Sequence, residues 1–137
     1  MQDNLGRIIN LPKMVDPRGN LTVAEQLKDV PFSMSRAYWV YDVPSGECRG
    51  GHAHKHCREF IVAVSGSFTV TLTNGQAQRT FMLNHPYQGL LVNTDVWRTL
   101  DDFSSEPFVL SWPRTLSMRM TISVIIRTIL NILHVRS

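Results

Sequence analysis

The sequence predicts an all-β fold, in the form of a small barrel or a sandwich. Short runs rich in branched and aromatic residues recur along the chain, and Gly, Pro, Asn and Asp separate them. No long amphipathic helix is indicated before residue 113. The 137 residues suffice for one domain, and 43% apolar against 18% charged residues is typical of a globular protein rather than a disordered one.

The first half of the chain contains three predicted strands before its histidine-rich segment. Residues 7–11 form the first, which ends at Pro12 because proline has no backbone N–H to donate. Residues 16–20 have the composition of a turn and lead into a second strand at 21–24. The third strand, at 36–42, is rich in the aromatic and branched residues that favour strands.

The second half begins with two runs that have strand character. An apolar run at 60–64 follows the histidines, and residues 68–73 alternate between apolar and polar. Asn74-Gly75 is a strong hairpin signal, because both residues readily adopt positive φ, so 78–83 is the return strand. Three further strands are predicted at residues 89–92, 96–100 and 107–112.

The charge of the chain is unevenly distributed. Residues 1–106 carry ten Lys and Arg against all eleven Asp and Glu, whereas residues 107–137 carry four Arg and no acid. The net charge of +3 therefore reflects the tail, and we do not expect a nucleic-acid partner. No signal peptide and no run long enough to span a bilayer is recognisable, which predicts a cytoplasmic protein without a membrane partner. Cys48 and Cys57 are then expected to be free thiols.

Two histidines, His52 and His54, are the centre of the predicted site. Because they lie two residues apart, both side chains leave the same face of an extended strand. Two imidazoles on one face can hold a metal ion or move protons. Their spacing to Gly51, Glu59 and Gly66 resembles the first motif of the cupin superfamily. This resemblance implies a cupin barrel, also called a jelly roll or double-stranded β-helix.

The metal interpretation meets a difficulty at the fourth ligand. In metal-binding cupins a further histidine on a later strand completes the site, and here Arg98 stands near that position. A guanidinium cannot ligate a metal and would repel it. His85 is an alternative ligand that lies in a predicted turn, and Cys48 and Cys57 are irregularly spaced for zinc.

Further motifs in the right order resemble a narrower group, the cupin sugar ketoisomerases of the FdtA/QdtA type, a WxcM-like C-terminal domain family. The matching motifs are Asp16-x-Arg18-Gly19, Arg36-x-Tyr38, residues 49–54, Val96-Trp97 and residues 102–105. The resemblance implies a homodimeric enzyme, without metal or cofactor, that moves a keto group from C4 to C3 of dTDP-4-keto-6-deoxyglucose. Its product would feed an aminotransferase that makes deoxyamino sugars for surface polysaccharide such as the O-antigen of lipopolysaccharide.

The residue types suit proton transfer. Histidine shuttles protons near neutrality because its pKa is ordinarily about 6.5. We expect His54 to be the base and His52 to relay protons or orient it. Tyr38 is expected to donate to the developing oxyanion. For Tyr38 the alternative is an ordinary core aromatic.

Three arginines and a tryptophan are the predicted binding residues. Arg18, Arg36 and Arg49 are candidates for the diphosphate, because guanidinium binds phosphate oxygens in a bidentate manner. Trp97 is expected to border the sugar or stack on thymine. Solvated surface charges and a core aromatic are the alternatives. A metal-dependent cupin enzyme and a non-catalytic sugar- or nucleotide-binding cupin remain as alternative functions.

The tail departs from the ketoisomerase pattern, in which an acidic, tyrosine-containing helical segment is expected. We therefore divide the chain into a barrel at 1–112 and a divergent apolar and basic tail at 113–137. The apolar residues between 116 and 135 are compatible with an amphipathic helix or with a strand. A reading-frame change in the gene is our hypothesis for this tail. Translation of the other frames would test it, and finding no acidic segment there would count against it.

Overall fold

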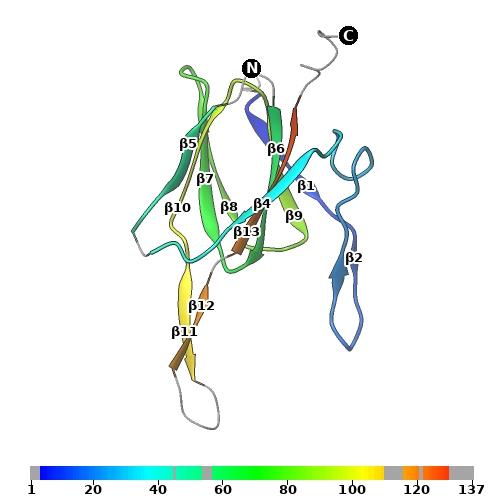
Figure 1. Ribbon diagram of the computed structural model, residues 1–137, viewed down its shortest axis with the longest axis vertical. Coiled ribbons are helices and arrows are strands. Elements are labelled where there is room, and N and C mark those ends of the chain that lie inside the picture. Colours follow the sequence, from blue (N-terminus) through cyan, green and yellow to red (C-terminus); the bar gives the residue numbers. More distant parts are fainter. Residues whose placement is uncertain (1–3, 45, 54–56, 110–115, 121, 130–137) are drawn as a thin grey trace.

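Two antiparallel sheets form the body of the protein (Figure 1). The computed structural model describes residues 4–44, 46–53, 57–109, 116–120 and 122–129. In spatial order, the first sheet contains β1 (Gly6–Asn10), β9 (Gln88–Val92), β6 (Cys57–Ser65), β13 (Ile122–Ile129) and β4 (Arg36–Val40). The second contains β5 (Arg49–His52), β10 (Trp97–Asp101), β7 (Phe68–Thr73) and β8 (Gln78–Leu83). Two small sheets pair β2 (Lys13–Met14) with β3 (Leu21–Thr22), and β11 (Ser105–Val109) with β12 (Leu116–Met120).

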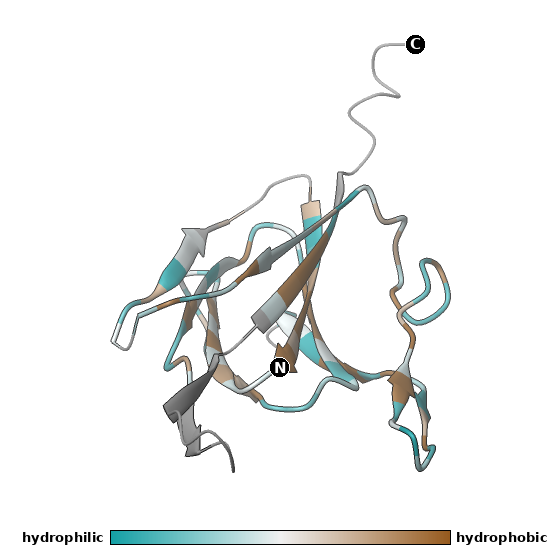
Figure 2. Cartoon of the chain, turned by 60° about the horizontal axis from the view of Figure 1, so that its bottom comes forward, coloured by the Kyte–Doolittle hydropathy of each residue, from teal (hydrophilic) through white to brown (hydrophobic). Residues whose placement is uncertain are grey.

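The main core lies between the two larger sheets. Ile61, Leu90 and Ile125 from the first sheet pack in one buried cluster with Val70 and Leu100 from the second. In the second sheet, β7 and β10 alternate between more and less buried residues, as expected for a sheet with one face toward the core. Figure 2 shows apolar segments on the strands, whereas several connecting loops are hydrophilic. The predicted all-β small barrel is confirmed.

A second apolar cluster covers part of the outer face of the first sheet. Val30 and Phe32, from the segment between β3 and β4, pack on Phe60 and Leu91. A β-carbon at Gly89 would meet the Phe60 ring at 1.9 Å, so only glycine fits beneath it. Both faces of β6 are therefore buried over its central residues, which explains the continuous apolar run in the sequence.

The hairpin predicted at Asn74-Gly75 is confirmed. Strands β7 and β8 pair from Phe68 opposite Leu83 to Thr73 opposite Gln78. The Asn74 side chain closes the loop, because its Oδ1 accepts from the backbone N–H of Gln76 at 2.9 Å and of Ala77 at 2.8 Å.

The apolar tail contributes a strand to the middle of the first sheet. Strand β13 pairs with β6 on one side and β4 on the other, so residues 122–129 belong to the barrel although we expected them beyond its boundary at 112. Of the two conformations compatible with this segment, the described residues adopt the strand. Val124 and Ile126 join the outer cluster, and Ile125 joins the core. The described part of the chain holds no helix long and apolar enough to cross a membrane.

Candidate active site

A carboxylate buried between the two sheets is the centre of the site. Glu59, on β6, is 1% exposed and accepts hydrogen bonds from side chains on three other strands. Arg98 on β10 donates from Nε to Oε1 and from Nη2 to Oε2 at 3.0 Å, a bidentate pair. Arg127 on β13 donates from Nη2 to Oε2, also at 3.0 Å. Glu59 therefore links its own sheet to the facing one.

The Tyr38 hydroxyl completes this network. It lies 3.2 Å from Glu59 Oε2, to which it donates, and it accepts from Arg98 Nη2 at 2.9 Å and Arg127 Nη2 at 3.0 Å. A phenolic oxygen has one proton and two lone pairs, so these three contacts use all of its hydrogen-bonding capacity. We call Tyr38, Glu59, Arg98 and Arg127 the buried network.

The buried network shifts the pKa values of its acidic members in opposite directions. Burial raises the pKa of Glu59, but the hydrogen bonds and charges of Arg98 and Arg127 outweigh it and hold that pKa below its usual value. Burial and the charge of Glu59 raise the pKa of Tyr38, which the two arginines offset only in part. At neutral pH the network therefore contains an ionised Glu59, a neutral Tyr38 and two guanidinium groups, with a net charge of about +1.

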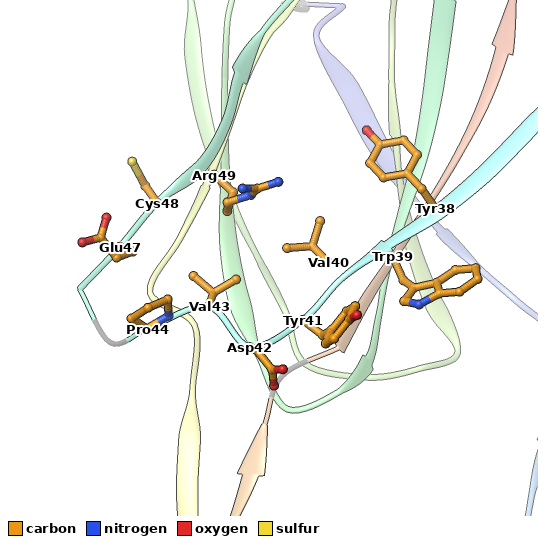
Figure 3. A pocket seen from close by; sticks show the side chains of 10 residues that line it. All are labelled: Tyr38, Trp39, Val40, Tyr41, Asp42, Val43, Pro44, Glu47, Cys48 and Arg49. Atoms are coloured by element: carbon orange, nitrogen blue, oxygen red, sulfur yellow. The ribbon is translucent and has the colours of Figure 1, made fainter.

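Two cavities that share lining residues lie between β4 and β5. The inner cavity, of about 280 Å³, is lined by Arg98 of the buried network and by the core residues Leu100 and Ile125. The outer cavity, of about 430 Å³, is lined by the end of β4, the following loop and the start of β5. Tyr38 and Arg49 line both. Figure 3 shows Arg49 pointing from β5 into the space between the strands, on the same side of β4 as Tyr38 and Val40.

Gly50 allows Arg98 to lie against β5. Arg98 Nη1 donates to the Gly50 carbonyl at 3.2 Å. Gly50 has φ of +76°, a conformation that residues with a β-carbon rarely adopt, and a β-carbon there would lie 2.0 Å from Arg98 Nη1. The glycine before the histidines is thus required by the buried guanidinium across from it.

Replacing Gly50 with Ala is expected to destabilise the protein by about 2–3 kcal/mol, because the backbone strain adds to displacement of a packed, buried side chain. The matched control is Gly75→Ala, where φ is +90° but no atom lies within 4 Å of the added carbon. Urea unfolding of both variants separates the two effects. If the two variants lost the same free energy of unfolding, the contact of the added carbon with Arg98 would have no effect on stability.

Comparison with known proteins assigns the chain to a family. A family model described as FdtA, WxcM-like, C-terminal, matches residues 4–113. This chain belongs to the FdtA family. Over 100 residues it is 39% identical to the TDP-4-oxo-6-deoxy-α-D-glucose-3,4-oxoisomerase of Aneurinibacillus thermoaerophilus, a match that covers 73% of this chain and 72% of that protein.

Solved structures of ketoisomerases share the fold of this FdtA-family chain. The 3,4-ketoisomerase from Helicobacter canadensis is 28% identical with a TM-score of 0.76, covering 89% of this chain and 81% of its own. WlaRB, a TDP-quinovose 3,4-ketoisomerase from Campylobacter jejuni, is 29% identical with a TM-score of 0.75, and the match covers 89% of this chain and 83% of WlaRB. QdtA from Thermoanaerobacterium thermosaccharolyticum, in complex with TDP, is 25% identical with a TM-score of 0.77, and the match covers 93% of this chain and 82% of QdtA. The predicted cupin-type barrel is confirmed.

The structure places several of the residues predicted for an FdtA-family site in or beside the inner cavity. Tyr38 and Arg49 line the inner cavity. Arg36 lies at the start of β4, with its guanidinium carbon 5.3 Å from the centre of the Tyr38 ring. The backbone of His52 lies opposite Arg98 in the pairing of β5 with β10. His54 lies outside the described residues.

Two predicted binding residues are placed elsewhere. Arg18 is in the loop between β2 and β3, where its side chain is 92% exposed and pairs with Asp16 at 3.0 Å. Trp97 packs toward Gly51, on the opposite face of β10 from its neighbour Arg98, because successive side chains of a strand alternate. Within one chain neither side chain lines the inner cavity. This placement does not support contact of Trp97 with the sugar ring.

The donor set does not suit the metal ion that some cupins hold. Glu59 would be one ligand, but both of its oxygens accept from guanidinium groups. Arg98 stands near the position where the cupin resemblance implied a fourth ligand, and a guanidinium cannot bind a metal. His85 instead stacks on Tyr87, with ring centres 4.9 Å apart. Cys48 and Cys57 are free, as predicted, and the described residues contain no cluster of three or more metal-binding side chains. We derive no metal-dependent step.

The residue that the sequence analysis missed is Arg127. In the sequence it is one of several arginines scattered through an apolar tail. Its spacing to Ile125 would have placed both on one face of a strand, but nothing local indicates that this face meets Glu59. Arg98 was recognised only as an unsuitable metal ligand, and its pairing with Glu59 depends on the approach of two different sheets.

Proposed function

We propose that this FdtA-family chain catalyses the 3,4-isomerisation of a dTDP-4-keto-6-deoxyhexose, moving the keto group from C4 to C3. The observation that carries this proposal is its 39% identity, over most of both chains, to a TDP-4-oxo-6-deoxyglucose 3,4-oxoisomerase. The related QdtA structure is a complex with TDP, which supports the same nucleotide for the substrate here. The chain is therefore an isomerase acting on a nucleotide-linked sugar.

The reaction balances through proton transfers alone. A base removes the proton on C3, beside the C4 ketone, and the C4 oxygen takes up a proton to give an enediol. The C3 hydroxyl then loses its proton to become the new ketone, while C4 receives a proton. Because C3 is oxidised as C4 is reduced, no external electron donor or cofactor is needed. We assign His54 as the base and His52 as the group that relays protons or orients it.

The inner cavity is suited to the enediolate. Its wall carries Tyr38 and the positively charged Arg49 and Arg98, and positive groups aimed at developing negative charge stabilise the transition state. Arg49 also lines the outer cavity, so it can reach a diphosphate there while the sugar occupies the inner cavity. Arg36 is the second candidate for the diphosphate. Arg18 remains a candidate only for a contact outside the inner cavity.

The assembly and location of the enzyme are also part of the proposal. The resemblance to sugar ketoisomerases supports a homodimer, and size-exclusion chromatography with light scattering tests it. A cytoplasmic location is proposed alongside. A cupin that binds a nucleotide sugar without turnover is the alternative that the same fold allows.

The test is incubation with dTDP-4-keto-6-deoxyglucose in deuterated water, followed by NMR. We expect the 3-keto product with deuterium at C4, because the acid that delivers this proton exchanges with solvent. The control is the same incubation without protein. Soluble, folded protein that gives neither 3-keto product nor label would contradict the proposed function.

A further inference from the structure

We propose that Arg127 is a positioning residue of the active site, which holds the Tyr38 hydroxyl and the Glu59 carboxylate in place from strand β13. This inference rests on the proposed function, and it extends the site beyond residues 4–113, where the match to the family ends. The C-terminal strand would then complete the site as well as the sheet.

The position of β13 brings Arg127 to the network. Arg127 lies opposite Glu59 in the pairing with β6 and opposite Arg36 in the pairing with β4. Its side chain is 15% exposed and alternates with outward-facing Ile126, so it points toward the barrel interior. One guanidinium on this strand can therefore reach acceptors on both neighbouring strands.

Arg127 contacts both of these acceptors. Its Nη2 lies 3.0 Å from the Tyr38 hydroxyl and 3.0 Å from Glu59 Oε2, and its Nε lies 3.3 Å from the same carboxylate oxygen. Its guanidinium carbon is also 5.3 Å from the centre of the Tyr38 ring. The planar fork of arginine suits this double contact, which a single ammonium group would not reproduce.

Removal of Arg127 would change the state of Tyr38. The Tyr38 hydroxyl would accept from Arg98 alone, and one of its lone pairs would have no donor from Arg127. Its O–H would then be less firmly directed at Glu59. The charge of Arg127 opposes the rise in the pKa of Tyr38, so this pKa would rise further without it. The network would also fall from two guanidinium groups to one, weakening the positive potential beside the inner cavity.

Arg58 provides a matched control on the other face of the same sheet. It neighbours Glu59 on β6, lies opposite residue 128 of β13, and donates to the Pro31 carbonyl at 2.9 Å. Its guanidinium carbon lies 5.5 Å from the centre of the Phe32 ring. Arg58→Met therefore removes a guanidinium with comparable structural contacts that does not touch Tyr38.

The experiment compares Arg127→Met, Arg127→Lys and Arg58→Met by steady-state kinetics and by NMR of tyrosine labelled with ¹³C at Cζ. The Tyr38→Phe variant assigns the signal. In Arg127→Met we expect a higher pKa for Tyr38 and a loss in kcat of about ten- to a hundredfold, the range found when a partner that orients a metal ligand is removed. We expect KM to change far less. Arg127→Lys should restore the pKa of Tyr38 but only part of kcat, and Arg58→Met should leave the Tyr38 signal unchanged.

Several results would overturn the proposal. One is that folded Arg127→Met keeps the wild-type Tyr38 pKa and kcat. Another is that Arg58→Met and Arg127→Met lose kcat equally. If Arg127→Met does not fold, Arg127→Lys decides, since wild-type values in every measurement would exclude a positioning role. Wild-type protein without isomerase activity would contradict the proposed function alone, because the NMR titration still reports whether Arg127 controls Tyr38.

Discussion

Glu59→Gln is expected to lower the free energy of unfolding by about 3–5 kcal/mol, the loss typical of removing one partner from a buried ion pair. Glutamine has nearly the same shape, so packing is retained while Arg98, at 3% side-chain exposure, loses its counter-charge. Arg127 loses its carboxylate partner in the same variant. Urea unfolding at pH 7 measures the difference, with an unchanged slope showing that the unfolded state is the same.

The pH dependence of the same variant is a second measure of this effect. Folding holds the pKa of Glu59 below the usual 4.5, so its ionised form stabilises the fold above about pH 4.5. This contribution is lost as the pH falls through the lower folded-state pKa, and the gap between wild type and Glu59→Gln should narrow there. Asp16→Asn is the control, because the Asp16–Arg18 pair is exposed and should contribute no measurable stability. A pH-independent gap would contradict the assignment.

His54→Asn is expected to reduce isomerase activity by about a hundredfold or more, the contribution typical of a general base. Asparagine keeps a polar side chain of similar size but cannot take the C3 proton at neutral pH. Binding of dTDP should remain within a few-fold of wild type, because the arginines assigned to the diphosphate are unchanged. The measurements are kcat by product NMR and the Kd for dTDP by calorimetry.

The control for this prediction is His85→Asn. His85 stacks on Tyr87, with Lys13 on the same ring at 4.6 Å, and the described cavities between β4 and β5 do not include it. This variant should retain wild-type activity. Retention of activity by His54→Asn would contradict its role as the base. Binding of dTDP without turnover by the wild-type protein would instead favour a non-catalytic binding module.

Some elements were predictable because their information is local. Strands β7 and β8 have the predicted bounds, since alternation and the Asn74-Gly75 signal lie within one short stretch of chain. Strand β13 was ambiguous, because its run of branched residues is compatible with two periodicities. Its strand conformation follows from partners far away in the sequence, on β4 and β6. Local pattern could not supply those partners.

The candidate site divides in the same way. The motif around His52 and His54 indicated a cupin, and Arg98 was recognised as a cation where a metal ligand was expected. The bidentate pair of Arg98 with Glu59 was not predicted, because the two residues belong to different sheets. Trp97 was predicted to bind substrate from its motif, but its side chain lies on the face of β10 opposite that of its neighbour Arg98. Register decides which of two adjacent side chains reaches the site.

The sequence alone determined the all-β class and the cupin resemblance, because motif spacing and residue type carry these. It also predicted proton transfer rather than metal chemistry, which stays a prediction. Only the tertiary structure decided that Glu59 is shared by Arg98 and Arg127 and that the C-terminal strand lies within the barrel. The physical reason is that a buried charge needs partners at hydrogen-bonding distance. Those partners lie on strands that are far apart in the sequence and are brought together by the sheet topology.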